Sequence, residues 1–180
     1  MPQAELQTSD PALSALAARA GALLLAARWR VALAESCTGG WVAKCLTDVP
    51  GSSQWFERGY VTYSNLSKEQ ALGVAAEVIE AFGAVSRPTA EQMAAGALHL
   101  SGAQLALAIT GVAGPDGGTP AKPVGLVWFA LAARSGAVEV LERRFDGDRE
   151  AIRRDAVATG LGLIIAAAER VTARGAPLSP

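Results

Sequence analysis

The sequence predicts a single three-layer α/β/α domain over residues 1–180. Its sheet is expected to be mixed and largely parallel, with a C-terminal antiparallel hairpin followed by a long helix. Short apolar runs alternate with longer segments of helical spacing, which indicates strands connected by helices. One of these runs, QLALAIT, is almost continuously apolar, as in strands buried on both faces. Near the end of the chain, two strand-like segments are separated by only four residues, which favours a hairpin.

Local signals support each element in turn. Asp10 and Pro11 begin the first helix, as an N-cap and a first helical residue. The expected strands cover residues 31–34, 59–65, 104–110, 124–133 and 138–145. The expected helices cover residues 11–27, 41–46, 75–82 and 87–100, with a short one that carries Lys68 and a last one from 149 to 172. The ends of the chain, 1–10 and 173–180, are expected to be frayed.

Composition excludes several classes of function. The chain is 51% hydrophobic, enough for the core of one ordinary domain. Sixteen basic and 17 acidic residues give a net charge of −1 with no basic run, so we expect no nucleic-acid partner. Cys37, Cys45 and the single histidine, His99, are too few for an ordinary zinc site. We therefore expect no metal.

The sequence also predicts no contact with a membrane. The longest uninterrupted apolar run, Gly160–Ala168, is about half of the ~20 residues that a spanning helix needs. The first ten residues lack the basic and then apolar pattern of a secretory signal. We expect a cytoplasmic protein with reduced cysteines. Its alanine-rich helices favour self-association into a homo-oligomer.

The segment Val31–Leu46 is typical of a strand, a tight turn and the start of a helix. Ser36 lies where the apolar strand ends, and Gly39 and Gly40 allow positive φ and close approach to the backbone. The first turn of a helix leaves N–H groups unpaired and favours negative charge. A hydroxyl nucleophile beside free N–H donors suits acyl transfer. The same residues also suit a plain turn with Thr38 as a helix cap.

Small polar residues and glycines follow the next two predicted strands as well. The second strand stops at Ser64-Asn65, and the third stops at Thr110-Gly111, which opens the densest glycine segment of the chain. Ligands of open α/β sheets bind beyond the carboxyl ends of the strands. If the first three strands run parallel, these three ends meet in one cleft.

Ser36 and Cys37 are the nucleophile candidates in that cleft. Cys37 at a helix N-terminus could react as a thiolate, but its histidine partner would be His99, which lies mid-helix between two leucines. Ser36 is therefore favoured, and Lys68, just past the second strand, is the best-placed base. A lysine acts as a base only if burial or a nearby cation, such as Arg149, keeps it partly neutral. Otherwise Lys68 is an ordinary surface charge.

Seven short motifs occur together and in order. They are AESCTGG (34–40), PGSS (50–53), VTYSN (61–65) with Lys68 three residues on, GAVS (83–86), AITGVAGPDGG (108–118), KPVG (122–125) and GDR (147–149). With these motifs the chain resembles the CinA C-terminal domain family, in its stand-alone form, over residues 10–170. Seven motifs in order are far more specific than any one of them.

The resemblance implies an amidase that hydrolyses the carboxamide of nicotinamide mononucleotide (NMN), giving nicotinate mononucleotide and ammonia without a metal or cofactor. The partner it implies is therefore a small pyridine nucleotide. It also implies that Ser36 is the nucleophile, Lys68 its base and Thr110 an assisting group. The implied substrate-binding residues are Tyr63 and Asn65 in the lining, Gly39, Gly40, Gly111 and Gly114 as backbone donors, and Arg149 as a phosphate or carboxylate contact. Which glycine loop holds the phosphate and which the oxyanion is left open.

The residues by themselves leave other functions open. A non-catalytic nucleotide-binding or regulatory domain could use the same glycine loops, and an amidase could act on a different small substrate. A carboxylate-pair hydrolase could use Glu35 and Asp116, although nothing in their spacing singles them out. Release of ammonia from NMN separates an amidase from a binding domain.

Overall fold

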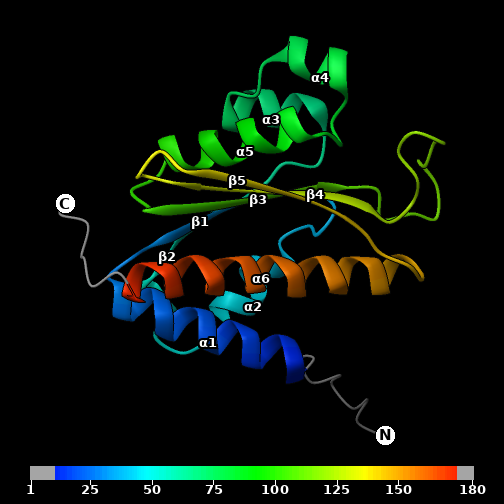
Figure 1. The fold of residues 1–180 in the computed structure, drawn as a ribbon. Helices are drawn as coiled ribbons and strands as arrows, with labels where there is room; N and C mark the ends of the chain where they lie inside the picture. The colour runs from blue at the N-terminus through cyan, green and yellow to red at the C-terminus, as the bar shows by residue number, and fades with distance from the viewer. Residues whose placement is uncertain (1–10, 174–180) are drawn as a thin grey trace, which may run out of the picture.

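The computed structural model describes residues 11–173. The predicted Asp10 cap and almost all of the predicted frayed ends lie outside the described residues. Five strands form one mixed sheet in the order β2-β1-β3-β4-β5, and helices cover both of its faces (Figure 1). The predicted α/β/α class is confirmed, including the antiparallel hairpin and the long helix that follows it.

The elements follow the predicted order. The strands are β1 (Val31–Glu35), β2 (Phe56–Val61), β3 (Leu105–Gly111), β4 (Leu126–Ala133) and β5 (Val138–Arg144). The helices are α1 (Pro11–Ala27), α2 (Trp41–Thr47), α3 (Asn65–Leu72), α4 (Ala76–Phe82), α5 (Arg87–His99) and α6 (Arg149–Ala173), with a 3-10 turn, η1 (Ser52–Gln54). β1 pairs in parallel with both β2 and β3, whereas β4 pairs antiparallel with β3 and β5. The carboxyl ends of β1, β2 and β3 therefore meet at one edge of the sheet, where the sequence predicts a cleft.

The second strand lies earlier in the chain than predicted. β2 covers Phe56–Val61 rather than residues 59–65. The reason is a capping box at the start of α3, in which the Ser64 hydroxyl accepts the Ser67 N–H and the Ser67 hydroxyl accepts the Ser64 N–H, each at 3.1 Å. The chain must leave the sheet before this cap, so Tyr63 lies in the connection between β2 and α3.

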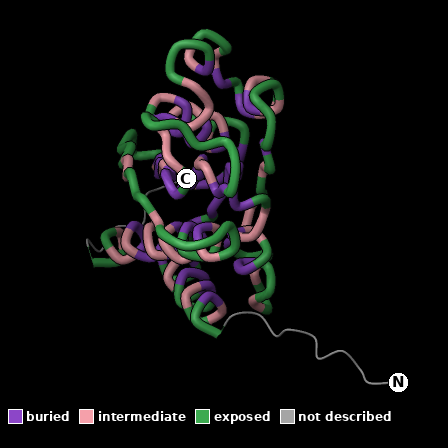
Figure 2. Tube along the Cα trace, turned by 90° about the vertical axis from the view of Figure 1, so that its right-hand side faces the viewer, coloured by how far each residue is buried: buried purple, intermediate pink, exposed green. Residues whose placement is uncertain are grey.

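Large and small side chains alternate along β1 and β3, and this divides the interior into two cores. The larger residues, such as Leu33 and Leu107, pack with buried residues of α1, α2 and α6. The alanines between them, such as Ala34 and Ala108, pack with residues of α3, α4 and α5. Figure 2 shows these buried segments in the interior of the molecule, with exposed segments around them. Because alanine takes little volume, α5 can approach the sheet closely on the second face.

Helix α6 corrects the expectation that no segment is suited to a membrane. By length and composition alone, α6 could span one. The prediction counted only uninterrupted apolar runs, and α6 reaches its high hydropathy over a longer window that tolerates a few charges. In the structure α6 packs along α1, and residues such as Val157, Leu161 and Ile164 are buried in the larger core. Its apolar side therefore serves as part of the interior.

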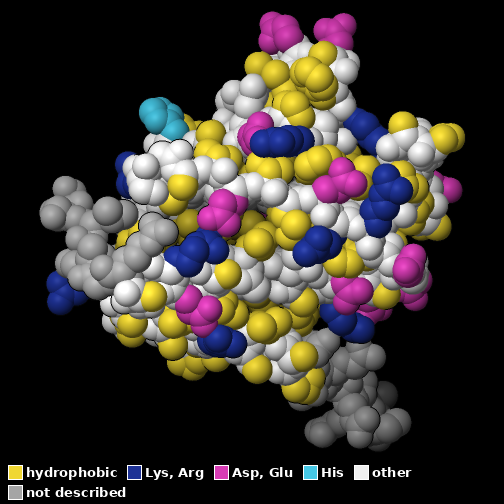
Figure 3. Space-filling view, viewed as in Figure 1, with side chains coloured by type: hydrophobic (Ala, Val, Ile, Leu, Met, Phe, Trp, Pro, Cys, Tyr) yellow, Lys and Arg dark blue, Asp and Glu magenta, His cyan; other side chains and the backbone are white. Residues whose placement is uncertain are grey.

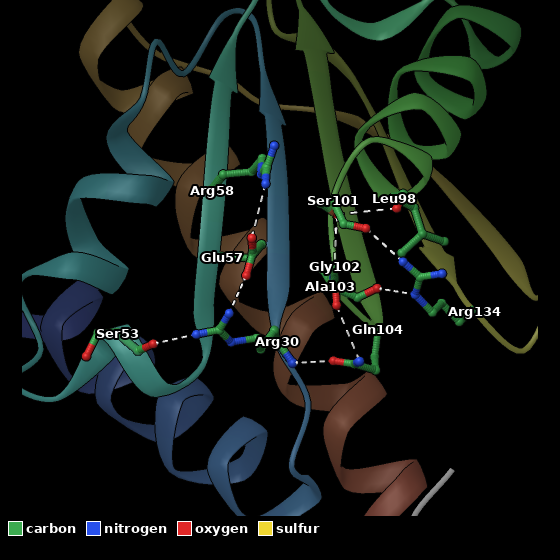
Figure 4. Close-up of polar contacts among 10 residues, drawn as sticks. All are labelled: Arg30, Ser53, Glu57, Arg58, Leu98, Ser101, Gly102, Ala103, Gln104 and Arg134. Atoms are coloured by element: carbon green, nitrogen blue, oxygen red, sulfur yellow. Dashed lines mark hydrogen bonds and ion pairs between the residues drawn. The ribbon is translucent and has the colours of Figure 1, made fainter. Parts of the chain in front are cut away.

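Polar contacts hold the edge of the sheet opposite to the three strand ends (Figure 4). Arg30, which precedes β1, forms an ion pair with Glu57 of β2 at 2.5 Å. Arg134, after β4, donates to the Ser101 and Ala103 carbonyls at 2.7 Å each. These contacts fix the connections at this edge, whereas glycine-rich segments lie at the other.

The surface in Figure 3 carries charges of both signs. Lys and Arg side chains lie among Asp and Glu side chains over this face, with no extended patch of one sign. This distribution agrees with the net charge of −1. On this face, therefore, no basic stripe of the kind that follows a nucleic-acid backbone is present.

Gly96 of α5 allows the close approach of α3, and it provides a test of this packing. A Cβ at Gly96 would lie 1.9 Å from the Leu72 carbonyl oxygen, so Gly96→Ala must push α3 away from α5. We expect the free energy of unfolding, measured in urea, to fall by about 1–3 kcal/mol, as for other overpacked interiors. Gly162→Ala in α6 is the matched control, because nothing lies within 4 Å of its Cβ position. Equal destabilisation by the two variants would contradict this account.

Candidate active site

A cavity of about 280 Å³ lies at the carboxyl ends of β1 and β3. Its walls come from the turn after β1, the β2–α3 connection, α3, the α4–α5 loop, the glycine loop after β3 and the start of α6. The structure brings seven of the predicted site residues into this lining, which are Ser36, Tyr63, Lys68, Thr110, Gly111, Gly114 and Arg149. The other three, Gly39, Gly40 and Asn65, do not line it.

Ser36 and Lys68 are in direct contact on the small-residue face of the sheet. Lys68 Nζ lies 3.1 Å from Ser36 Oγ and donates to the Thr62 carbonyl at 2.7 Å. Lys68 is only 1% exposed, and Ser36 is 9% exposed. The alternation along β1 explains this placement, because Ser36 continues the series of Ala32 and Ala34 toward α3.

Burial lowers the pKa of the Lys68 ammonium below its ordinary value, because the charged form loses its hydration. Burial is therefore the first cause of the shift, and Arg149, which the sequence suggested as the nearby cation, is not. A neutral amine can accept the Ser36 hydroxyl proton through its lone pair while it donates to Thr62. The geometry and the pKa direction both suit a lysine base.

Thr110 is the neighbour of Ser36 on the same face of the sheet. The Ser36 N–H donates to the Ile109 carbonyl at 2.9 Å, which extends the parallel ladder one residue beyond β1. The Thr110 hydroxyl donates to the Ala84 carbonyl at 2.8 Å, in the α4–α5 loop. Thr110 lines the cavity and makes no hydrogen bond with Ser36 or Lys68. Because its hydroxyl hydrogen is donated to Ala84, its oxygen can act toward a further group only as an acceptor.

Glu35 occupies the helix N-terminus that the sequence suggested as a ligand site. Its carboxylate is buried on the other face of the sheet and accepts the N–H groups of Gly40, Val42 and Ala43 at 3.0, 3.2 and 2.9 Å. The Gly39 N–H donates to the Ser36 carbonyl at 3.0 Å. The expectation of free donors at Gly39 and Gly40 is therefore corrected, because a buried acid and the turn itself use them. Thr38 is not the cap of α2 either, since Gly40 holds that position.

Two other N–H groups of the turn remain as candidate donors. Within the described residues, the N–H groups of Cys37 and Thr38 find no oxygen acceptor. Both belong to the residues that directly follow Ser36, but only Cys37 lines the cavity, because Thr38 is fully buried. In acyl-transfer enzymes the N–H after the nucleophile commonly stabilises the oxyanion.

The alternative chemistry through Cys37 or a carboxylate pair does not fit this geometry. Burial raises the pKa of the Cys37 thiol to about 12, so it is protonated at neutral pH. His99 is exposed at the end of α5 and does not line the cavity. Glu35 is bonded to α2 and does not line the cavity, whereas Asp116 does. Of the two nucleophile candidates, Ser36 is the one whose side chain lies beside a buried amine.

Arg149 and Tyr63 stand at the mouth of the cavity. Arg149, the first residue of α6, donates to the Tyr63 hydroxyl at 2.8 Å and to the Gly114 carbonyl at 2.7 Å. Tyr63 is 61% exposed. Asp116 of the glycine loop also lines the cavity, so one basic and one acidic side chain reach its outer part. A ligand with separated positive and negative charges would match them.

Sequence reasoning missed several contributors to this site. It assigned no role to Thr62, whose carbonyl holds the lysine, or to Ala84 and Val85, which line the cavity from the α4–α5 loop. The GAVS motif at 83–86 was the available signal for that loop. Residues 11–173 contain no cluster of three or more His, Cys, Asp or Glu that could hold a metal ion.

The fold and the site together define a class, an α/β/α domain with a buried serine–lysine pair beyond the ends of parallel strands. The model of the CinA C-terminal domain family matches residues 13–168. The chain belongs to this family.

Similar proteins agree with that assignment. The nicotinamide-nucleotide amidohydrolases PncC of Enterobacter agglomerans and Escherichia coli strain K12 are 49% and 51% identical to this chain over 153 residues, which is 85% of this chain and 93% of each relative. The crystal structure of the competence/damage inducible protein CihA from Agrobacterium tumefaciens is similar, with a TM-score of 0.86 and 46% identity over 89% of this chain and 98% of that one. A CinA superfamily protein from Klebsiella pneumoniae has a TM-score of 0.84 and 37% identity over 88% of this chain and 98% of that one.

The lowered pKa of Lys68 predicts a pH-dependent stability. Between that lowered pKa and the unfolded-state value of ~10.4, the unfolded chain binds more protons than the folded one, so wild-type stability rises with pH. Lys68→Met has no ionisable group at this position, so its stability lacks this pH dependence. The free energy of unfolding of the variant relative to wild type should therefore be most favourable below the lowered pKa of Lys68 and should decline as the pH rises toward ~10.4. Urea unfolding at a series of pH values measures this, and a constant difference would show an ordinary lysine pKa.

Proposed function

We propose that this protein is an amidase that converts nicotinamide mononucleotide and water to nicotinate mononucleotide and ammonia. The observation that carries the proposal is the buried Lys68 amine, 3.1 Å from Ser36 Oγ, at the base of the cavity. The printed names of the PncC relatives support NMN as the substrate. A cytoplasmic homo-oligomer remains part of the proposal on the sequence arguments given above.

In the first half of the reaction, Ser36 Oγ attacks the carboxamide carbon while Lys68 Nζ takes the hydroxyl proton. The resulting oxyanion accepts a hydrogen bond from the N–H group of Cys37, the residue after the nucleophile. The C–N bond then breaks, and the Lys68 ammonium returns its proton to the departing nitrogen, which leaves as ammonia. Thr110 Oγ1 accepts a hydrogen from the carboxamide nitrogen and holds it toward Lys68.

In the second half, water releases the product from the serine. The neutral Lys68 amine takes a proton from water, and the hydroxide attacks the ester carbonyl carbon. The ester bond breaks, Ser36 Oγ regains the proton from Lys68, and nicotinate mononucleotide leaves as a carboxylate once its acid proton has passed to solvent. Lys68 thus serves as a base and then as an acid in each half of the reaction. Such a group works best with a pKa near the working pH. Burial lowers the pKa of Lys68 in that direction.

The charges at the cavity mouth suit a nucleotide with a cationic ring. NMN carries a positive pyridinium ring and a negative phosphate. We assign the phosphate to Arg149, whose guanidinium forms a fork for phosphate oxygens, and the ring to the side of the cavity that Asp116 lines. Tyr63 already contacts Arg149 at 2.8 Å and would keep the guanidinium in place. Gly111 and Gly114 remain candidate backbone donors in the lining.

Replacement of the nucleophile tests the proposal directly. Ser36→Ala should lower kcat for ammonia release from NMN by at least ~10³-fold, because the acyl-enzyme can no longer form. Cys37→Ala is the matched control and should keep most of kcat, since its thiol is protonated at neutral pH. An inactive Cys37→Ala beside an active Ser36→Ala would move the chemistry to the thiol.

Lys68→Arg tests whether Lys68 acts as a base or only as a fixed positive charge. Arginine keeps the positive charge, but its pKa above ~12 prevents it from taking a proton from serine. We expect this variant to lose most of kcat, while the wild-type rate rises with pH through an ionisation below the ordinary lysine value. Turnover close to wild type by Lys68→Arg would mean that the base lies elsewhere. If the wild-type protein binds NMN but does not hydrolyse it, a nucleotide-binding domain would be favoured instead.

A further inference from the structure

The turn after Ser36 is held by a residue outside the cavity, Arg153 of α6. Arg153 Nε donates to the Cys37 carbonyl and one terminal nitrogen donates to the Thr38 carbonyl, both at 3.0 Å. The guanidinium also lies over the Trp41 ring, 5.4 Å from its centroid, in a cation–π contact. Arg153 is half-buried and does not line the cavity. Its direct contacts with the site are therefore those with the turn.

The two bonds from Arg153 orient the peptide groups on both sides of Cys37. In a trans peptide group, the C=O and the N–H of the next residue point in opposite directions. When Arg153 holds the Cys37 carbonyl, the Thr38 N–H of the same peptide group points away from Arg153. When it holds the Thr38 carbonyl, it orients the Gly39 N–H, which donates to the Ser36 carbonyl. That carbonyl shares its peptide group with the Cys37 N–H.

We propose that Arg153 is a positioning residue for acyl transfer at Ser36, because it holds the turn that aims the Cys37 N–H at the reacting carbonyl. The inference rests on the proposed amidase function. Arginine suits this role because its rigid fork reaches two carbonyl oxygens at once, whereas the ammonium of a lysine acts as a single point charge. Glu35 fixes the far end of the same turn through the N–H groups of α2, so the two charged side chains hold it from both ends.

Arg153→Met tests this role, since it keeps an apolar side chain of similar length and removes the donors. We expect kcat for NMN to fall by about 10- to 100-fold, below the ~10²–10³-fold loss for deleting a donor outright, because the donors remain but are misdirected. KM should change by less than about threefold, since Arg153 does not line the cavity. Arg154→Met is the matched control and should keep the wild-type kcat, because Arg154 is an exposed neighbour paired with Glu150.

A second readout does not depend on the nucleotide. A fluorophosphonate labels an activated serine and needs the nucleophile, its base and the oxyanion donors. Labelling of Ser36 should slow in Arg153→Met by a factor similar to the loss of kcat. The midpoint of the pH–rate profile should not move, because burial and not a neighbouring cation lowers the pKa of Lys68. Arg153→Lys should lose only part of the rate, since one carbonyl can still be held.

The outcomes separate this inference from the proposed function. Arg153-dependent labelling in a protein that does not hydrolyse NMN would leave the inference intact and overturn the amidase proposal. Wild-type kcat and labelling in Arg153→Met, with only a lower Tm, would overturn the inference and leave the amidase proposal intact. If Arg153→Met does not fold, Arg153→Lys decides, because a wild-type kcat and labelling rate in that variant overturn the inference as well.

Discussion

The structure depends on keeping one lysine amine out of water. Lys68 is 1% exposed, and burial rather than a neighbouring charge lowers the pKa of its ammonium. An unpaired buried amine is unfavourable, so the chain must offer it partners, which are the Thr62 carbonyl and the Ser36 hydroxyl. The same two contacts that satisfy the amine place it beside the nucleophile. Stability and chemistry are therefore decided by the same interaction.

Side chains on the two faces of the sheet fix different parts of the site. Ser36 and Glu35 are consecutive residues, so their side chains point to opposite faces. Ser36 points to the alanine face, where α3 and α5 approach closely enough to bury Lys68. Glu35 points to the other face, where it binds three N–H groups of α2 and fixes the start of that helix. A shift of one residue in β1 would exchange the two side chains and remove both functions.

The turn between β1 and α2 shows why a helix N-terminus in sequence is not yet a ligand site. Its N–H groups have several acceptors to choose from, and here a buried carboxylate from the preceding strand takes three of them. The donors that remain, on Cys37 and Thr38, lie closer to Ser36 than the predicted glycines do in the chain. Their direction depends on Arg153, which is 115 residues from Thr38 in sequence. Local pattern identified the turn but not the residues that orient it.

Much of the fold could be predicted from the spacing of apolar residues and the lengths of the connections. The hairpin, the parallel strand ends and the order of helices all come from short-range periodicity and connection length. The boundaries of β2 did not, because the Ser64–Ser67 capping box competes with the strand for the same residues. The high hydropathy of α6 was also missed, since uninterrupted runs underestimate a helix whose apolar residues are spread over a longer window.

By itself, the sequence determined the family, the α/β/α class, and the position of Ser36 at the end of one strand and of Lys68 just past another. These are properties of motifs and periodicities, which a chain carries locally. Only the tertiary structure decided that Lys68 is buried against Ser36, that Glu35 takes the donors of Gly40 and its neighbours, and that Arg153 reaches the turn from α6. Each of these depends on which distant segment covers a residue. Burial and long-range contacts, unlike periodicity, exist only once the layers have packed.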